Sequence, residues 1–194
     1  MKILVIGDGC YDIFRYGDIE RMCPEAPVPV FNPTNETKNG GMALNVVNNL
    51  ESLGVENVDY MTNENQITKI RYIDNKSNQM VIRVDENDRC ERCNLSGMDF
   101  KKYDAIIISD YCKGFLSEED IKFICDNNKN VFVDTKKQLG SWIENADFIK
   151  INEFEYKKNH EFLNGNEHKL IVTMGSKGCM WNNTVFPAGK VKIA

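Results

Sequence analysis

The sequence predicts an α/β fold in which a mostly parallel sheet has helices on both faces. Five short aliphatic runs each end in acidic, amide, hydroxyl or glycine residues, and segments with helical spacing lie between some of them. Uninterrupted apolar runs of this kind are typical of strands that are buried on both faces. Two further segments break the pattern and predict a small antiparallel flap. With 194 residues, of which 42% are hydrophobic, we expect one domain that spans residues 1–194.

The first predicted strand covers residues 3–6 and opens onto Asp8, with Asp12 one short turn later. Open α/β sheets bind ligands at the carboxyl ends of their strands. Asp8 and Asp12 are therefore candidates for holding substrate hydroxyls. The alternative is a solvated turn, because Asp and Gly are ordinary turn residues.

The first flap segment covers residues 14–31 and contains the prolines of a PEAPVP sequence. Proline disrupts helices and is excluded from central strands, so this segment is expected at an edge. Residues 38–41 then predict a flexible turn that contains Gly40 and Gly41. Backbone N–H groups at such a turn can meet a ligand at close range, and Asn45 follows in the first turn of a helix predicted to end at Gly54. The alternative is a plain flexible connection into the helix.

The second flap segment covers residues 66–85, where two alternating runs flank a polar turn. Lys69 and Arg71 lie two residues apart, so they share one face of the first run. Their positive patch suits a phosphorylated small molecule. The alternative is that these charges only protect an edge strand from aggregation.

The other predicted strands begin near residues 105, 131, 148 and 170, and a helix capped by Ser117 and Asp120 follows the first of them. Two short strands, 179–181 and 185–193, are expected after the last. The carboxyl ends of these strands supply further candidate ligand-binding residues: Asp110, Lys136, Asn152, Glu155, Thr173, Gly175, Ser176 and Gly178.

Composition excludes several classes of function. The net charge is −5 and no Lys/Arg cluster is present, which argues against a nucleic-acid partner. The absence of a long apolar run or signal segment predicts a cytoplasmic protein without a membrane span. Seven cysteines without a secretory signal predict reduced thiols, and the single CxxC pair lacks the partners of a zinc site. The sequence has no P-loop, no GxGxxG and no GxSxG motif.

Glycine turns, acids and isolated cations at one edge suit phosphoryl transfer, which depends on positioning and charge neutralisation. The motifs occur in the order found in a known group of kinases: GD with Asp12, PEAPVP, GG with Asn45, TK with Arg71, RVD, SDYxKG, Asp134 with Lys136, NxxE and a glycine loop after Thr173. The chain thus resembles the ribokinase-like (PfkB) sugar kinase family, and within it the kinase domain that makes heptose bisphosphate in the ADP-heptose pathway. PEAPVP and SDYxKG are the specific matches.

This resemblance implies a ribokinase-like three-layer sandwich with a β flap, and phosphoryl transfer from ATP, with Mg²⁺, to heptose 7-phosphate. It implies that Asp12, Gly40, Gly41 and Asn45 hold the sugar hydroxyls, that Asp8 and Asp110 also belong to the substrate site, and that Asp110 and Lys136 face the region of phosphate transfer. From their position on the flap, we infer that Lys69 and Arg71 meet the phosphate of the sugar. The resemblance also implies that Lys136, Asn152, Glu155, Thr173, Gly175, Ser176 and Gly178 bind the nucleotide, and that Glu155 acts on the metal indirectly.

The sequence also departs from the family pattern. The catalytic base of the family belongs to a GAGD motif, which is not in this sequence, so the catalytic residue is unknown. The segments 61–66 and 155–169 are also short. Two interpretations stay open: a C-terminally truncated, incomplete sugar kinase, and a non-catalytic sugar- or nucleotide-binding remnant that forms a homodimer through its flap.

Overall fold

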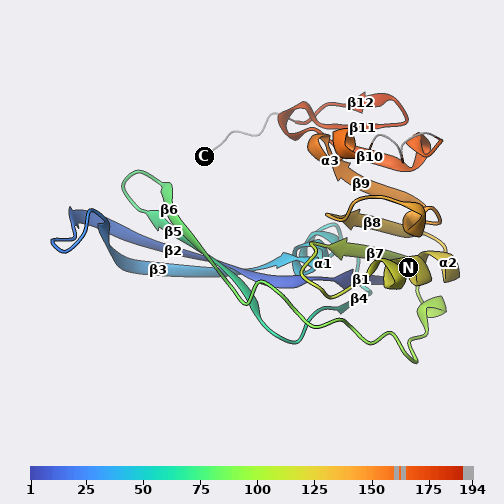
Figure 1. The fold of residues 1–194 in the computed structure, drawn as a ribbon, viewed down its shortest axis with the longest axis horizontal. Coiled ribbons are helices and arrows are strands. Elements are labelled where there is room, and N and C mark those ends of the chain that lie inside the picture. Colours follow the sequence, from blue (N-terminus) through green and yellow to red (C-terminus); the bar gives the residue numbers. More distant parts are fainter. Residues whose placement is uncertain (160–161, 163–164, 190–194) are drawn as a thin grey trace.

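A computed structural model describes residues 1–159, 162 and 165–189, which form two sheets (Figure 1). The main sheet has eight strands in the order β12-β11-β10-β9-β8-β7-β1-β4. Its strands from β4 to β10 are parallel, whereas β11 and β12 are antiparallel additions. The bounds are β1 Ile3–Gly7, β4 Val58–Met61, β7 Ala105–Asp110, β8 Val131–Thr135, β9 Phe148–Asn152, β10 Leu170–Thr173, β11 Cys179–Trp181 and β12 Thr184–Phe186.

The flap is a second sheet of four strands in the order β3-β2-β5-β6. Its bounds are β2 Gly9–Met22, β3 Pro29–Met42, β5 Ile67–Asp74 and β6 Gln79–Glu86. We call this sheet the lid. It projects as a long twisted ribbon from the carboxyl edge of the main sheet near β1 and β4 (Figure 1).

Helices pack on both faces of the main sheet, as the sequence predicts. The helix α1 (Ala43–Ser52) packs on Val5 of β1, while Leu4 and Ile6 point to the opposite face. That opposite face carries the larger core, with α2 (Glu118–Asn127), and α3 (Glu153–Lys158) lies beside β9 and β10. Short 3₁₀ turns cover Phe100–Lys102, Ser141–Ile143, Glu167–Lys169 and Gly175–Lys177.

The face that carries α1 shows a row of aromatic rings farther along the sheet. Phe132 of β8 stacks on Phe148 of β9 with ring centroids 5.1 Å apart, and Trp181 of β11 lies 6.3 Å from Phe148. Register places Phe132 on the same face as Ile107, which packs with the α1 cluster. Alternate residues of β8 and β9 therefore serve two different packing layers.

One expectation for the lid is wrong. Residues 38–41, predicted as a flexible turn, belong to β3, where Lys38 pairs with Ile13 and Gly41 with Cys10. The segment 14–31 contains the ends of two long strands, β2 and β3, which extend far beyond the predicted flap boundaries. Pairing with β3 on one side and β5 on the other holds β2 extended in spite of its polar composition.

Most other elements agree with the prediction. The helix α2 begins with a capping box in which Ser117 and Asp120 satisfy each other's backbone N–H groups. Gly54 follows α1 with a φ of 85°, a left-handed conformation that favours glycine. The strand predicted for residues 185–193 is β12, Thr184–Phe186, and residues 190–193 lie outside the described part. Each described helix is too short or too polar to span a bilayer.

Candidate functional site

The carboxyl edge of the main sheet brings the predicted site residues together in two groups. Asp12, Gly40 and Gly41 lie on the lid strands next to the end of β1. The ends of β8, β9 and β10 carry Lys136, Asn152 and Thr173, and β7 runs between the two groups. One continuous edge therefore holds both predicted sites.

Asp8 forms the structural centre of this edge. It is completely buried, and its carboxylate accepts hydrogen bonds from the backbone nitrogens of Tyr111 at 2.6 Å and of Lys113 and Phe115 at 3.2 Å. The Cys90 thiol donates to the same carboxylate at 3.6 Å. A carboxylate that accepts this many hydrogen bonds fixes the backbone of the loop around it. In this structure Asp8 shapes the edge from within and presents no surface to a ligand.

Asp110 is enclosed in a similar way at the end of β7. It is 1% exposed, and its Oδ2 accepts from the Thr135 hydroxyl at 2.5 Å and from Lys137 Nζ at 2.7 Å. Lys137 also donates to the backbone oxygen of Leu116 at 3.0 Å. This buried ion pair, with its additional hydrogen bonds, ties the ends of β7 and β8 together. Like Asp8, Asp110 is buried and stabilises the segments that form the edge.

Asp12 lies on the lid and faces the edge. Its Oδ1 accepts from Arg71 Nη1 at 2.5 Å, and both side chains are about one-quarter exposed. Gly41 lies against the other carboxylate oxygen, so closely that a Cβ at position 41 would overlap Asp12 Oδ2. The glycine pair therefore leaves room for the acid. Asn45 lies close by in the first turn of α1, where it is exposed.

The two groups meet at the ring of Tyr111. Lys69 of the lid lies with its Nζ 6.0 Å from the ring centroid, and Lys136 after β8 lies 5.8 Å from it. The ring itself packs on Cys10, Met42 and Ile67 at the base of the lid. Burial is the main cause that raises the pKa of Tyr111, so the phenol stays protonated at neutral pH. Two cations from different sheets thus approach one neutral aromatic ring.

Asn152 and Glu155 form a capping box at the start of α3. Asn152 Oδ1 accepts from the backbone nitrogens of Phe154 and Glu155 at 2.9 Å, while Glu155 Oε2 accepts from the Asn152 nitrogen at 2.8 Å. The other oxygen of Glu155 accepts from Lys136 Nζ at 2.7 Å. The NxxE sequence therefore has a structural role here, and it also fixes the position of the Lys136 ammonium group.

These contacts shift the pKa values of both Glu155 and Lys136. Burial would raise the pKa of Glu155, but the hydrogen bonds from Lys136 and from the Asn152 backbone hold it below its ordinary value. Burial would lower the pKa of Lys136, but the bond to Glu155 and the charge of Asp134 raise it. Both groups are therefore charged at neutral pH, and the lysine keeps its positive charge at the edge.

The glycine loop after β10 forms the far end of the edge. Thr173 donates to the Ile151 oxygen at 3.3 Å, and the turn Gly175–Lys177 follows, with Ser176 exposed. Gly175 and Gly178 have φ values of 57° and 99°, and a Cβ at Gly178 would overlap the Phe186 oxygen. This loop needs glycine for its conformation, and Thr173 at its start pairs in register with Asn152.

Comparisons with known proteins agree with this architecture, although no protein-family profile matches the chain. A bifunctional protein HldE of a Nitratiruptor species is 32% identical over 87% of this chain and 44% of its own length. The bifunctional protein HldE of Helicobacter acinonychis is 32% identical over 87% of this chain and 45% of its own length. The chain thus spans less than half the length of the curated relatives that it matches.

Solved structures share the fold at lower sequence identity. A ribokinase of Thermotoga maritima aligns with a TM-score of 0.61 and 16% identity, over 98% of this chain and 79% of that one. A carbohydrate kinase of Agrobacterium tumefaciens aligns with a TM-score of 0.62 and 15% identity, over 95% and 74%. The chain has a ribokinase-like fold and is similar in sequence to HldE.

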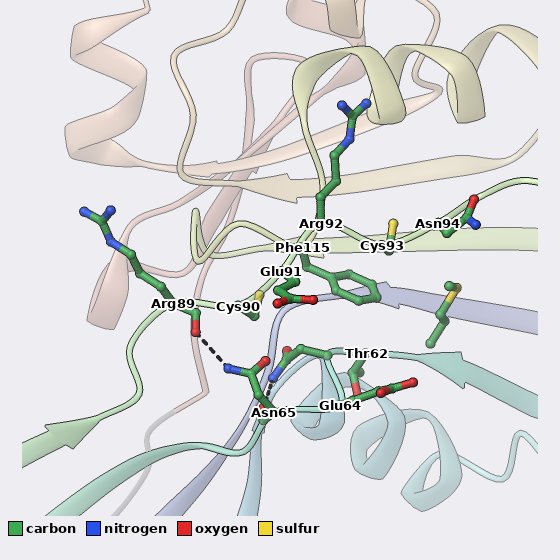
Figure 2. Close-up of a pocket in the computed structure, with 12 residues that line it drawn as sticks. Thr62, Glu64, Asn65, Arg89, Cys90, Glu91, Arg92, Cys93, Asn94 and Phe115 are labelled. Atoms are coloured by element: carbon green, nitrogen blue, oxygen red, sulfur yellow. Dashed lines mark hydrogen bonds between the residues drawn. The ribbon is translucent and has the colours of Figure 1, made fainter.

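A cavity of about 660 Å³ lies beside the edge of this ribokinase-like domain and contains none of the predicted site residues. Figure 2 shows it between the loop after β4, with Thr62 and Asn65, and the segment that carries Arg89 to Asn94. Asn65 closes one side by donating to the Arg89 oxygen at 2.9 Å.

The CxxC pair lines this cavity. Burial is the main cause that raises the pKa of Cys90 to about 12 and that of Cys93 to about 11. Both are free thiols in this structure, and at neutral pH they are protonated. The described residues contain no cluster of three or more His, Cys, Asp or Glu side chains that could hold a metal.

Sequence reasoning assigned no role to three residues of the ribokinase-like edge. Tyr111 links the two lysines, Lys137 neutralises Asp110, and Cys90 donates to Asp8. Tyr111 belongs to the SDYxKG motif, so that motif was the available signal. Lys137 and Cys90 have no comparable sequence signal, because their contacts join segments that lie 27 and 82 residues apart.

Proposed function

We propose that this ribokinase-like domain transfers the γ-phosphoryl group of ATP to a sugar phosphate, with heptose 7-phosphate as acceptor and heptose 1,7-bisphosphate as product. The observation that supports this most is that Lys69 of the lid and Lys136 of the main sheet's edge both approach the ring of Tyr111. The chain is also 32% identical to HldE. The bond between the γ-phosphorus and the β–γ bridging oxygen would break, a bond to the sugar oxygen would form, and the hydroxyl would lose its proton.

On the acceptor side, Asp12 would accept hydrogen bonds from sugar hydroxyls beside Gly40, Gly41 and Asn45. Lys69 and Arg71 share one face of β5 and would hold the phosphate of the sugar. Carboxylates suit hydroxyl donors and guanidinium groups suit phosphate oxygens, so the residue types match the two ends of such an acceptor. Asp8 and Asp110 would act by fixing the edge beneath these groups.

On the donor side, Lys136 would neutralise phosphate charge, and the loop from Thr173 to Gly178 would lie along the nucleotide. A ribokinase of Cryptococcus neoformans with this fold was solved in complex with ADP, with a TM-score of 0.55 and 12% identity over 99% of this chain and 81% of its own. That complex supports nucleotide binding by this fold. Because the sequence has no GAGD motif, the proposal assigns no catalytic base.

Magnesium fits this edge only as an ion held through phosphate and water. Both oxygens of Glu155 already accept hydrogen bonds, and the side chain is 14% exposed. Mg²⁺ keeps several waters and often binds through substrate phosphates with one or two carboxylates. Glu155 would therefore meet it indirectly, through water and through its hold on Lys136.

The direct test is ADP release by this chain with ATP, Mg²⁺ and heptose 7-phosphate. Turnover that needs all three is expected. Lys136→Met should lower it by about tenfold or more, because the lysine would no longer neutralise the negative charge on the phosphate groups in the transition state. Lys158→Met is the matched control, since Lys158 is exposed on α3 and should leave turnover unchanged. Tight ADP binding without any turnover would instead support the non-catalytic remnant.

We also propose that the lid forms a homodimer contact. The edge strand β6 exposes Met80 by 57% and Ile82 by 54%, and its outer backbone groups have no strand partner within the described sheet. Exposed apolar edge strands favour pairing with another chain. Sedimentation should show a dimer that Ile82→Lys dissociates, while Phe123→Lys on α2 is the control. A monomer at all concentrations would contradict the contact.

A further inference from the structure

The ion pair between Arg71 and Asp12 joins the two ends of the proposed acceptor site. Arg71 Nη1 lies 2.5 Å from Asp12 Oδ1, and the guanidinium carbon lies 5.1 Å from the centroid of the Phe14 ring. The strands β2 and β5 run parallel, and Arg71 pairs in register with Phe14, two residues beyond Asp12. Arg71 is therefore turned back along the strand toward the acid.

This arrangement engages one of the two carboxylate oxygens of Asp12. Its Oδ1 accepts from Arg71, and its Oδ2 lies so close to Gly41 that a Cβ at that position would overlap it. Arg71 is likewise engaged, because its guanidinium group, which could bind a phosphate, is already paired with the Asp12 carboxylate. Binding of either end of an acceptor thus has to compete with the ion pair.

A phosphate group can win that competition for Arg71. It carries up to two negative charges and several acceptor oxygens, whereas the carboxylate carries one charge, and guanidinium groups bind phosphate in a bidentate manner. Lys69, two residues earlier on the same face of β5, adds a second cation. A neutral hydroxyl offers no comparable attraction and leaves the ion pair closed.

We propose that Arg71 is a specificity-determining switch, which a phosphorylated sugar draws away from Asp12 so that the carboxylate becomes free to accept the sugar hydroxyls. This inference rests on the proposed function, because it takes the acceptor to be a sugar phosphate. The ion pair then selects phosphorylated over unphosphorylated sugars, since only the former releases Asp12.

Binding of inorganic phosphate, measured by calorimetry, tests the switch without ATP or turnover. Asp12→Asn removes the carboxylate that competes for Arg71, so this variant should bind inorganic phosphate about two- to fivefold more tightly than the unchanged chain. Arg71→Met should bind it more weakly. Asp12→Ala repeats the test with a second side chain in case the amide forms a new hydrogen bond.

The lid offers a matched control in Arg15, whose Nε lies 2.6 Å from Glu36 Oε2 on neighbouring strands. Arg15 lies on the face of β2 opposite to Asp12, because the two positions are three residues apart in a strand. Glu36→Gln frees this arginine and should leave the affinity for phosphate unchanged. An equal gain in Glu36→Gln would overturn the switch, because it would show that any freed arginine on the lid binds the anion.

Sugar binding gives the second measurement. The unchanged chain should bind heptose 7-phosphate and not the unphosphorylated heptose, and Arg71→Met should lose most of this preference. Phosphate affinity in Asp12→Asn that is equal to or lower than that of the unchanged chain overturns the switch, even if ADP release is found. The expected gain without any ADP release keeps the switch and contradicts the proposed kinase activity, so the two failures are distinct.

Discussion

The carboxylate of Asp8 lies 2.6 Å from the backbone nitrogen of Tyr111, a contact between residues 103 positions apart in the chain. It joins the end of β1 to the loop after β7. The same carboxylate also accepts from the nitrogens of Lys113 and Phe115. The buried carboxylate of Asp8 thus fixes the conformation of the loop that carries Tyr111.

Removing this acid should destabilise the protein. Asp8→Ala leaves three backbone N–H groups without their acceptor, and the expected loss in the free energy of unfolding is about 3 kcal/mol or more. Urea denaturation followed by circular dichroism measures it. Glu20→Gln, an exposed change on the lid, should shift the free energy by less than about 0.5 kcal/mol. Equal stabilities for the two variants would show that the loop does not depend on Asp8.

The capping box at α3 should make stability depend on pH in the acid range. The pKa of Glu155 in the folded protein lies below its ordinary value of 4.5. The stabilisation from its charge is therefore fully present above about pH 4.5 and is lost as the pH falls through the lower folded-state pKa. Glu155→Gln keeps the capping geometry but removes the charge, so it should be less stable at pH 7 by about 1 kcal/mol.

The measurement is the difference in unfolding free energy between the two proteins, followed from pH 7 down to pH 3. This difference should shrink as the pH falls. Glu153→Gln serves as the control, because Glu153 is 47% exposed and its distance to Lys177 Nζ is 3.4 Å. A difference that stays constant across this range would mean that the charge of Glu155 contributes nothing.

Much of the fold follows from local patterns in the sequence. The buried strands β1 and β7 are uninterrupted aliphatic runs, and Ser117 and Asp120 mark the start of α2. The lid strand β3 could not be predicted in the same way, because its residues 32–38 are all exposed and therefore carry no apolar alternation. Its extended form depends on pairing with β2, which is a contact between distant residues.

The candidate site shows the same limit. The topology rule places Asp8, Asp12 and Asp110 at one edge; in the structure Asp8 and Asp110 lie at the ends of β1 and β7, whereas Asp12 lies on the lid strand β2. The rule does not say which way each carboxylate points. Asp12 faces Arg71, whereas Asp8 and Asp110 turn inward, because backbone N–H groups and Lys137, supplied by other segments, draw them there.

The thiols of the CxxC pair should react slowly. With a pKa of about 12, Cys90 has a thiolate fraction of roughly 10⁻⁴ at pH 8, and only the thiolate is alkylated. Iodoacetamide labelling followed by mass spectrometry should modify Cys112, whose side chain is exposed, before Cys90. In urea, Cys90 should be labelled at the rate of an ordinary cysteine. Rapid labelling of Cys90 in the folded protein would contradict its burial against Asp8.

Gly41 should be intolerant of any side chain, because it lies between two groups at the base of the lid. A Cβ at this position would overlap Asp12 Oδ2 and would lie 2.6 Å from the Cys10 sulfur. Gly41→Ala should therefore lower the free energy of unfolding by about 1–3 kcal/mol and displace the carboxylate from its position.

Displacement of the Asp12 carboxylate in Gly41→Ala should also weaken binding of the acceptor, which gives a second measurement. The affinity for heptose 7-phosphate should fall by more than the loss of stability explains, in protein that is still folded at the assay temperature. Gly189→Ala is the control, since a Cβ there would meet no atom of the described residues within 4 Å. If Gly41→Ala binds the sugar phosphate as well as Gly189→Ala does, the close packing of Gly41 on Asp12 has no part in holding the acceptor.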